Sequence, residues 1–249
     1  MPSPRLLALA LAVVLAACRT SPDARAVVER AIDVHGGDVL QRSHVAFDFR
    51  DRRFEVTRDG GRFRYERTFD DSTGRVHDVM TNDTLYREVD GTAVPLDSAL
   101  RRSVTSGLNS VVYFALLPFK LDDPAVRTRY LGPATIEGAP YHEVEVTFRQ
   151  EGGGRDYQDR YVYWFHRDRH TMDYLAYSFQ EDGGGTRFRQ AFNPRTVGGV
   201  RVADYHNYTA DTLGTAIEHY DALVGTDALR HVSDVVLDNV RVRPLGAGR

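Results

Sequence analysis

Apolar and polar residues alternate along most of the chain with a period of two. Phe47 and Phe49, for example, are separated by Asp48, and Arg50 follows. Successive side chains of a β-strand point to opposite faces, so this alternation predicts strands with one apolar and one polar face. Turn signals separate such segments, as in the Asp-Gly-Gly sequence at residues 59–61. The pattern predicts a meander of half-buried antiparallel strands.

One strongly apolar run of helical length, Ser106–Lys120, stands among these alternating segments. The predicted helix begins before it, with Asp97 or Ser98 as the N-cap, and Gly107 is predicted to interrupt it. Its second half is apolar nearly all round, which is typical of a buried helix. Pro118 ends it, because the residue before a proline is disfavoured in the helical region. We therefore predict a central helix that packs inside the sheet.

A shorter amphipathic helix is predicted near the N-terminus, with Ser21 as its N-cap and Gly36-Gly37 as its end. Apolar residues recur through it at helical spacing, as at Val27 and Ile32. Together these elements predict an α+β fold that is mainly antiparallel β. We expect a curved half-barrel sheet with helices packed in its concave face.

The first residues have the pattern of an export signal. Residues 1–17 are predicted to be a lipoprotein signal peptide, with Arg5, the apolar run Leu6–Leu15 and Leu-Ala-Ala-Cys at residues 15–18 in the expected order. Cys18 is the only cysteine among the 249 residues, so no intrachain disulfide can form, and its thiol is the predicted lipidation site. An ordinary secretory signal with a chance cysteine is the alternative. Residues 18–22 are predicted to be a lipid-anchored tether, and residues 23–249 a single lipoprotein-carrier-like half-barrel domain.

The predicted strand at residues 156–166 is apolar on both faces. Tyr161 and Tyr163 share one face, and Val162 and Trp164 share the other. An ordinary core needs one apolar face, so the excess indicates a sheet that curves around a ligand groove; an aromatic-rich core with tyrosines at its rim is the alternative. The residues that we predict to line the groove are Tyr113, Phe114, Leu117, Phe119, Trp164 and Tyr177.

No catalytic motif is recognisable in the sequence. There is no Gly-x-Ser-x-Gly elbow and no His-Glu-x-x-His pair. Lys120 follows an apolar run and is a candidate for amine chemistry, although a helix-capping role in water explains it more simply. His166 and His170 flank a predicted turn, but their spacing matches no established metal-ligand motif, so we predict no metal and no cofactor. The two triple-glycine loops at residues 152–154 and 183–185 lack the phosphate-binding patterns.

Four longer segments resemble a family of uncharacterised bacterial outer-membrane lipoproteins, which is catalogued only as a domain of unknown function. They are Asn109–Val126, Arg129–Gly138, Tyr157–His166 and Met172–Phe179. The resemblance implies kinship and no activity. The arrangement of signal, early helix, meander and central helix is similar to the lipoprotein-carrier fold of Lol-type periplasmic proteins, in which a half-barrel closed by helices holds acyl chains. Fold does not fix function.

These observations predict a lipoprotein that is held to the membrane by its N-terminal lipid, in the outer membrane and facing the periplasm. It is expected to bind or carry an acyl chain or another apolar ligand between the curved sheet and the central helix. A structural envelope lipoprotein without a ligand is the first alternative, and an enzyme that uses Lys120 or the His166/His170 pair is the second. The formal net charge of −3, together with the membrane tether, argues against a nucleic-acid partner.

Overall fold

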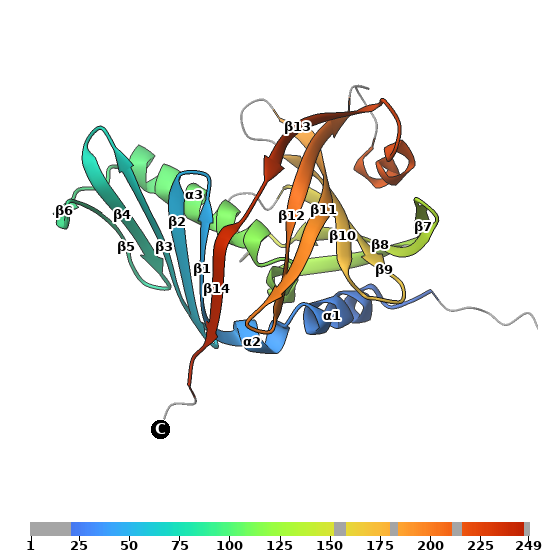
Figure 1. Cartoon of the computed structure of the whole chain (residues 1–249), viewed down its shortest axis with the longest axis horizontal. Helices are drawn as coiled ribbons and strands as arrows, with labels where there is room; N and C mark the ends of the chain where they lie inside the picture. The colour runs from blue at the N-terminus through green and yellow to red at the C-terminus, as the bar shows by residue number, and fades with distance from the viewer. Residues whose placement is uncertain (1–20, 152–157, 180–183, 211–215, 247–249) are drawn as a thin grey trace, which may run out of the picture.

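The computed structural model describes residues 21–151, 158–179, 184–210 and 216–246. Its strands form two open seven-stranded sheets that stand side by side (Figure 1). In spatial order, the first sheet consists of β14 (Asp238–Pro244), β1 (Arg42–Phe49), β2 (Arg52–Asp59), β3 (Arg62–Asp71), β4 (Gly74–Thr81), β5 (Leu85–Val89) and β6 (Thr92–Val94). The second consists of β13 (Leu229–Val235), β12 (Val200–Ala210), β11 (Gly185–Val197), β10 (Met172–Phe179), β9 (Arg160–His166), β8 (Ala139–Phe148) and β7 (Val126–Ile136).

Every pair of neighbouring strands is antiparallel, and almost all neighbours in space are also neighbours in sequence. The exception is β14, which leaves β13 at the edge of the second sheet and pairs with β1 in the first (Figure 1). The predicted class is confirmed: a mainly antiparallel α+β fold with curved, unclosed sheets and helices on their inner side. One curved sheet was expected, and the strands form two sheets.

Two N-terminal helices, α1 (Ala24–Val34) and α2 (Gly37–Gln41), pack at one end of the sheets (Figure 1). Asp23, not Ser21, is the N-cap of α1, because its carboxylate accepts a hydrogen bond from the backbone N–H of Arg25 at 3.0 Å. Gly36 joins the helices with φ of +84°, and a Cβ there would meet the carbonyl oxygen of Gly199. Glycine is therefore needed both for the backbone angle and for the close approach of β12.

The central helix, α3 (Ser98–Ala115), begins at Asp97, as predicted, and it crosses from the first sheet to the second (Figure 1). Gly107 does not interrupt it, contrary to the prediction. A Cβ at Gly107 would lie 2.5 Å from Arg67 Nη1, so the glycine lets the helix pack closely on β3. None of the helices in the described part of the chain is both long and apolar enough to span a membrane.

The side of α3 that packs on the sheets carries a fully buried stripe: Val104, Leu108 and Val112. Asn109 and Ser110, on another side, are exposed. The sequence predicted that the second half of the helix is buried nearly all round, and this prediction is wrong. Val111, Phe114 and Ala115, which lie outside the stripe, line a groove that is described below.

The second sheet separates two apolar cores. Tyr163 and Phe165 of β9 belong to the main core, which both sheets, α1 and α3 share. Trp164 lies on the other face of β9, in a second core under the short 3₁₀ helices η3 (Ile217–His219) and η4 (Asp221–Leu223). Both faces of β9 are apolar because both are covered. A β-bulge in β10 also places Met172 in the main core, on the face opposite to the one expected from alternation.

Candidate ligand-binding groove

A groove of about 360 Å³ opens at the seam between the two sheets, along the C-terminal half of α3. One wall is the helix, another is the turn after β1, and the third is formed by β10 to β13 and the residues that follow β13. A volume of this size is within the range of small-molecule sites, about 300–1,000 Å³. The lining residues are Phe49, Arg50, Ser110, Val111, Phe114, Ala115, Tyr177, Arg189, Ala203, Tyr205, Val235 and Leu237.

Two aromatic rings and an arginine contact one another in the lining of the groove. The Phe114 ring of α3 lies 5.2 Å from the Tyr177 ring of β10, measured between centroids. The guanidinium carbon of Arg189, from β11, lies 4.0 Å from the Phe114 ring centroid, a cation–π contact. Arg189 Nη2 donates to the Tyr177 hydroxyl at 3.2 Å, whereas its buried Nε has no hydrogen-bond partner among the described residues. The buried Nε cannot be reached from the groove. A guanidinium has five N–H donors, so the bond to the Tyr177 hydroxyl leaves other donors on the Nη atoms for a ligand.

The charge of the groove is positive. Arg189 and the exposed Arg50 both line it, and the Arg50 guanidinium carbon lies 5.1 Å from the centroid of the Phe49 ring. Among the described residues that line the groove, none is acidic. The remaining lining residues are largely apolar or aromatic. The groove therefore suits a molecule with an apolar body and a negatively charged group.

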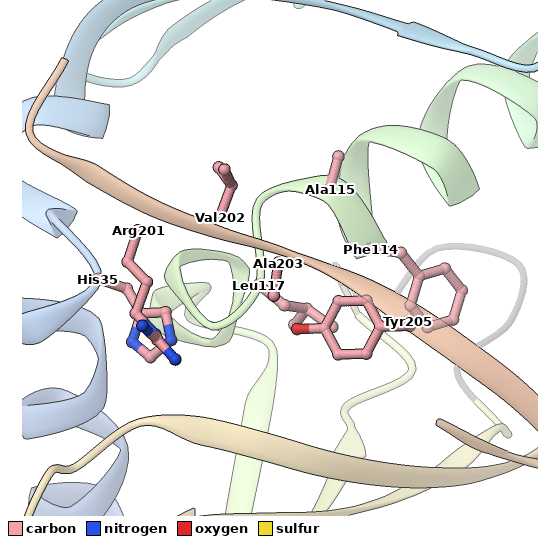
Figure 2. A pocket seen from close by; sticks show the side chains of 8 residues that line it. All are labelled: His35, Phe114, Ala115, Leu117, Arg201, Val202, Ala203 and Tyr205. Atoms are coloured by element: carbon pink, nitrogen blue, oxygen red, sulfur yellow. The ribbon is translucent and has the colours of Figure 1, made fainter. Parts of the chain in front are cut away.

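A small void of about 10 Å³ lies beside the groove, and Figure 2 shows its lining. Phe114 and Tyr205 lie at one end of this lining and Leu117 in its middle, and His35 and Arg201 lie close together at the other end (Figure 2). The groove and the void share four lining residues: Phe114, Ala115, Ala203 and Tyr205. Burial raises the pKa of the Tyr205 phenol well above its usual range, so this hydroxyl stays protonated.

His35, at one end of the void, has a neutral side chain. Its Nδ1 donates to the Ala31 carbonyl at 2.7 Å, and its own carbonyl accepts from the Arg201 N–H at 3.2 Å. Burial, with a smaller effect of the Arg201 charge, lowers the pKa of His35 to about 4, and the Ala31 hydrogen bond and the Asp173 charge only partly offset this. The imidazole is therefore uncharged at neutral pH.

The lowered pKa of His35 predicts a loss of stability in mild acid. From pH 7 to pH 5 the unfolded chain takes up a proton at His35 that the folded chain does not, so this residue contributes a loss of about 2 kcal/mol. Burial raises the pKa of Glu143 to about 7, which acts in the opposite direction over this range, so the wild-type profile alone is not diagnostic. Urea denaturation of the wild type and His35→Gln should show that their difference in unfolding free energy changes by about 2 kcal/mol between these pH values. An unchanged difference would contradict a neutral, buried His35.

Of the six residues predicted to line a groove, three lie in the lining of the groove or of the void and three lie elsewhere. Phe114 and Tyr177 line the groove, and Leu117 lines the void beside it. Tyr113 points instead to β9, where its hydroxyl lies 2.7 Å from the Tyr163 hydroxyl. The other two are core residues away from the lining: Phe119 contacts Arg58 in the main core, and Trp164 lies in the second core.

Arg189, Tyr205 and the small Ala203 line the groove but were not among the residues predicted to do so. A sequence signal existed, because Arg189 and Ala191 alternate with the apolar Phe188 on β11 and must share a face. Which element that face meets depends on the path of α3, which no local pattern specifies.

The residues considered for catalysis are placed in structural roles. Lys120 lies in the 3₁₀ helix η1 (Phe119–Asp122), half-buried, with Nζ 3.4 Å from the Tyr65 hydroxyl. His166 is buried, and its Nδ1 accepts hydrogen bonds from the backbone N–H groups of Asp168 and Arg169, both at 3.2 Å. His170 adopts a left-handed φ of +55° in the same turn. Cys18, the glycines at residues 152–154 and the glycine at residue 183 lie outside the described residues.

Comparison with known proteins places the chain in a family. The model of a family of unknown function, DUF6503, matches residues 5–236. The chain belongs to this family. The predicted resemblance to an uncharacterised family is thereby confirmed, and no curated protein sequence matches the chain.

The fold is similar to that of a LolA superfamily protein from Nitrosomonas europaea. The TM-score is 0.51 at 13% sequence identity, over 90% of this chain and 96% of that chain. A DUF1329 family protein from Desulfovibrio piger has a TM-score of 0.48 at 10% identity, over 90% of this chain and 95% of that chain. The predicted similarity to the Lol-type fold is confirmed, and at these identities it concerns the fold alone.

Proposed function

We propose that the protein is a lipid-anchored envelope lipoprotein that binds or carries an amphiphilic molecule in the groove beside α3. The observation that carries the proposal is the groove itself, in which an apolar and aromatic lining surrounds the Arg189 guanidinium. The likeness to a LolA superfamily fold supports a role of this class.

The proposed ligand has a long apolar chain and an anionic head, as a fatty acid or a phospholipid does. The chain would lie against Val111, Phe114 and Leu237, where it removes apolar surface from water. The anionic oxygen would accept hydrogen bonds from Arg189, since charge-assisted bonds of a guanidinium are among the stronger ones in proteins. The exposed Arg50, in the lining of the groove, would attract the same charge.

The proposed location rests on the N-terminal sequence. Cys18 follows Leu15-Ala16-Ala17, which is the processing pattern of a bacterial lipoprotein. We propose that this thiol carries the lipid, and that the domain faces the periplasm from the outer membrane. A groove that takes acyl chains would then work next to the surface that supplies them.

Filling the groove tests the proposal. In the full-length protein, Ala203→Trp is expected to weaken binding of a fluorescent long-chain fatty acid by about 10- to 100-fold, because overpacking a site costs about 1–3 kcal/mol. Ala93→Trp, at an exposed position of β6, is the matched control and should leave the affinity unchanged. Fluorescence titration measures both. If no fatty acid binds, and native mass spectrometry finds no co-purified lipid, the protein is a structural lipoprotein without a ligand.

The anionic head is tested at Arg189. Arg189→Gln is expected to weaken binding of the fatty acid by about tenfold or more, because a hydrogen bond to a charged group contributes about 1.5–3 kcal/mol. The methyl ester of the same acid lacks the charge and should bind the two proteins about equally. Equal losses for acid and ester would mean that Arg189 supports the shape of the groove and does not bind the head.

A further inference from the structure

Two histidines and an aspartate meet on the outer face of the second sheet, away from the groove. His206 lies on β12, and His231 and Asp234 lie on the edge strand β13. His206 Nδ1 and His231 Nε2 lie 2.8 and 2.7 Å from the same oxygen, Asp234 Oδ1. Among the described residues these three form a group whose potential ligand atoms all lie within 4.8 Å of one another.

A β-bulge brings the three side chains to one face. His206 is directly opposite Asp234, and Asn207 is opposite Ser233, but Tyr208 is opposite His231, so Val232 has no partner in the ladder. In a regular strand, residues three apart point to opposite faces. The extra residue reverses His231, which then lies on the same face as Asp234. Bulges commonly re-aim a side chain in this way at functional sites.

Aromatic rings hold both imidazoles in position. The Phe192 ring of β11 stacks on His206 with a centroid distance of 4.0 Å and an interplanar angle of 5°. The Tyr208 ring meets His231 nearly edge-on at 5.6 Å and His206 at 6.3 Å. The cluster is partly exposed, so water can complete a coordination shell.

We infer that His206, His231 and Asp234 bind a divalent transition metal ion, of which Zn²⁺ is the expected example. Two imidazole nitrogens and one carboxylate oxygen are ligands that suit Zn²⁺, Cu²⁺ or Ni²⁺, whereas Ca²⁺ and Mg²⁺ prefer sets made of oxygen alone. The ion would take the place of the two bridging hydrogen bonds. Each imidazole would carry its proton on the ring nitrogen that does not face the ion.

The site would connect the edge strand β13 to β12 where these two strands line the groove with their opposite face. Val235, which follows Asp234, lines the groove on the other face of the sheet. Tyr205, which precedes His206, does the same from β12. A bound ion would therefore hold the two strands that form this wall, without contacting the ligand.

Metal binding by the full-length protein tests the inference. The chain is produced without a polyhistidine tag, stripped with a chelator, and titrated with Zn²⁺ alone in equilibrium dialysis. One saturable site per chain is expected. His206→Ala and His231→Ala should each weaken it by more than tenfold, since the loss of a residue that only supports a ligand already costs about 10- to 100-fold. In the wild type, Cu²⁺ should give an electron paramagnetic resonance spectrum with coupling to two imidazole nitrogens.

His77→Ala is the matched control. His77 also lies on a strand between acidic groups, with Nε2 3.0 Å from Glu66 and Nδ1 3.5 Å from Glu88. It offers a single imidazole, so its loss should leave the high-affinity Zn²⁺ site intact. Circular dichroism checks that each variant is folded. The inference is wrong if the stripped wild type shows no saturable Zn²⁺ binding, or if His206→Ala/His231→Ala binds as tightly as the wild type; the cluster is then only a hydrogen-bonded surface group.

Discussion

Replacing Asp78 by asparagine (Asp78→Asn) is expected to lower the free energy of unfolding by about 3–5 kcal/mol. Asp78 is fully buried in β4 between two arginines of the neighbouring strands. Arg67 Nη2 lies 2.5 Å from Asp78 Oδ2, and Arg87 Nε lies 2.6 Å from Oδ1. The substitution keeps the size of the side chain but removes the negative charge that both guanidinium groups face. Arg67, only 6% exposed, would retain a buried charge without compensation. Urea denaturation at neutral pH measures the loss.

The same substitution at the surface of the same sheet provides the control. Asp59 pairs with Arg42 across β1 and β2 at 2.8 Å, and both side chains are about half exposed. An exposed pair of this kind contributes about 0–1 kcal/mol, so Asp59→Asn should have little effect. Similar losses in the two variants would show that the burial of the Asp78 cluster is not what makes it important.

Shortening Leu108 to alanine (Leu108→Ala) is expected to cost about 3–5 kcal/mol. Leu108 lies in the middle of the buried stripe of α3 and has no exposed surface. The substitution removes apolar contacts and leaves a cavity between the helix and the sheets, which a rigid core only partly fills. Its effect is again measured by urea denaturation. Because Leu108 does not line the groove, the variant that remains folded should still bind fatty acid.

Val34 provides the comparison for Leu108. It lies at the end of α1 and is 45% exposed. Val34→Ala should change the unfolding free energy by less than about 0.5 kcal/mol, because exposed substitutions away from caps and buried pairs are nearly neutral. If Leu108→Ala were equally mild, α3 would not be the central packing element that the fold indicates.

The groove and the proposed metal site occupy opposite faces of the same two strands. Tyr205 and Val235 point to the groove, and their neighbours His206 and Asp234 form the outer cluster. The period of two along a strand is what separates them. Each proposal can therefore fail without the other: Ala203→Trp should not change Zn²⁺ binding, and His231→Ala should not change the fatty-acid affinity at low metal concentration.

Clear local patterns, such as regular alternation or a capping residue, predicted helices and strands correctly. The alternation around Phe47 and Phe49 predicted a strand, which the structure shows as β1. Asp97 was one of the two residues predicted as the N-cap of the central helix, and it is the N-cap. Both signals come from residues close in sequence, namely the two-residue period of a strand and a carboxylate that accepts from a backbone N–H nearby. The predicted Gly107 break was wrong for the same reason: the need for glycine there comes from Arg67, forty residues away in the chain.

The sequence by itself determined the mainly antiparallel class, the two long helices, and the apolar residues of Ser106–Lys120 that include Phe114 of the groove. It could not determine which faces meet. Trp164 lies in a second core because η3 and η4 pack over its face of the sheet. Arg189 lies over Phe114 because α3 passes along that part of the second sheet. One unpaired residue, Val232, turned His231 toward Asp234. These outcomes depend on contacts between distant segments and on a shift of register. The local pattern of apolar and polar residues is almost the same whether or not such a contact or shift is present.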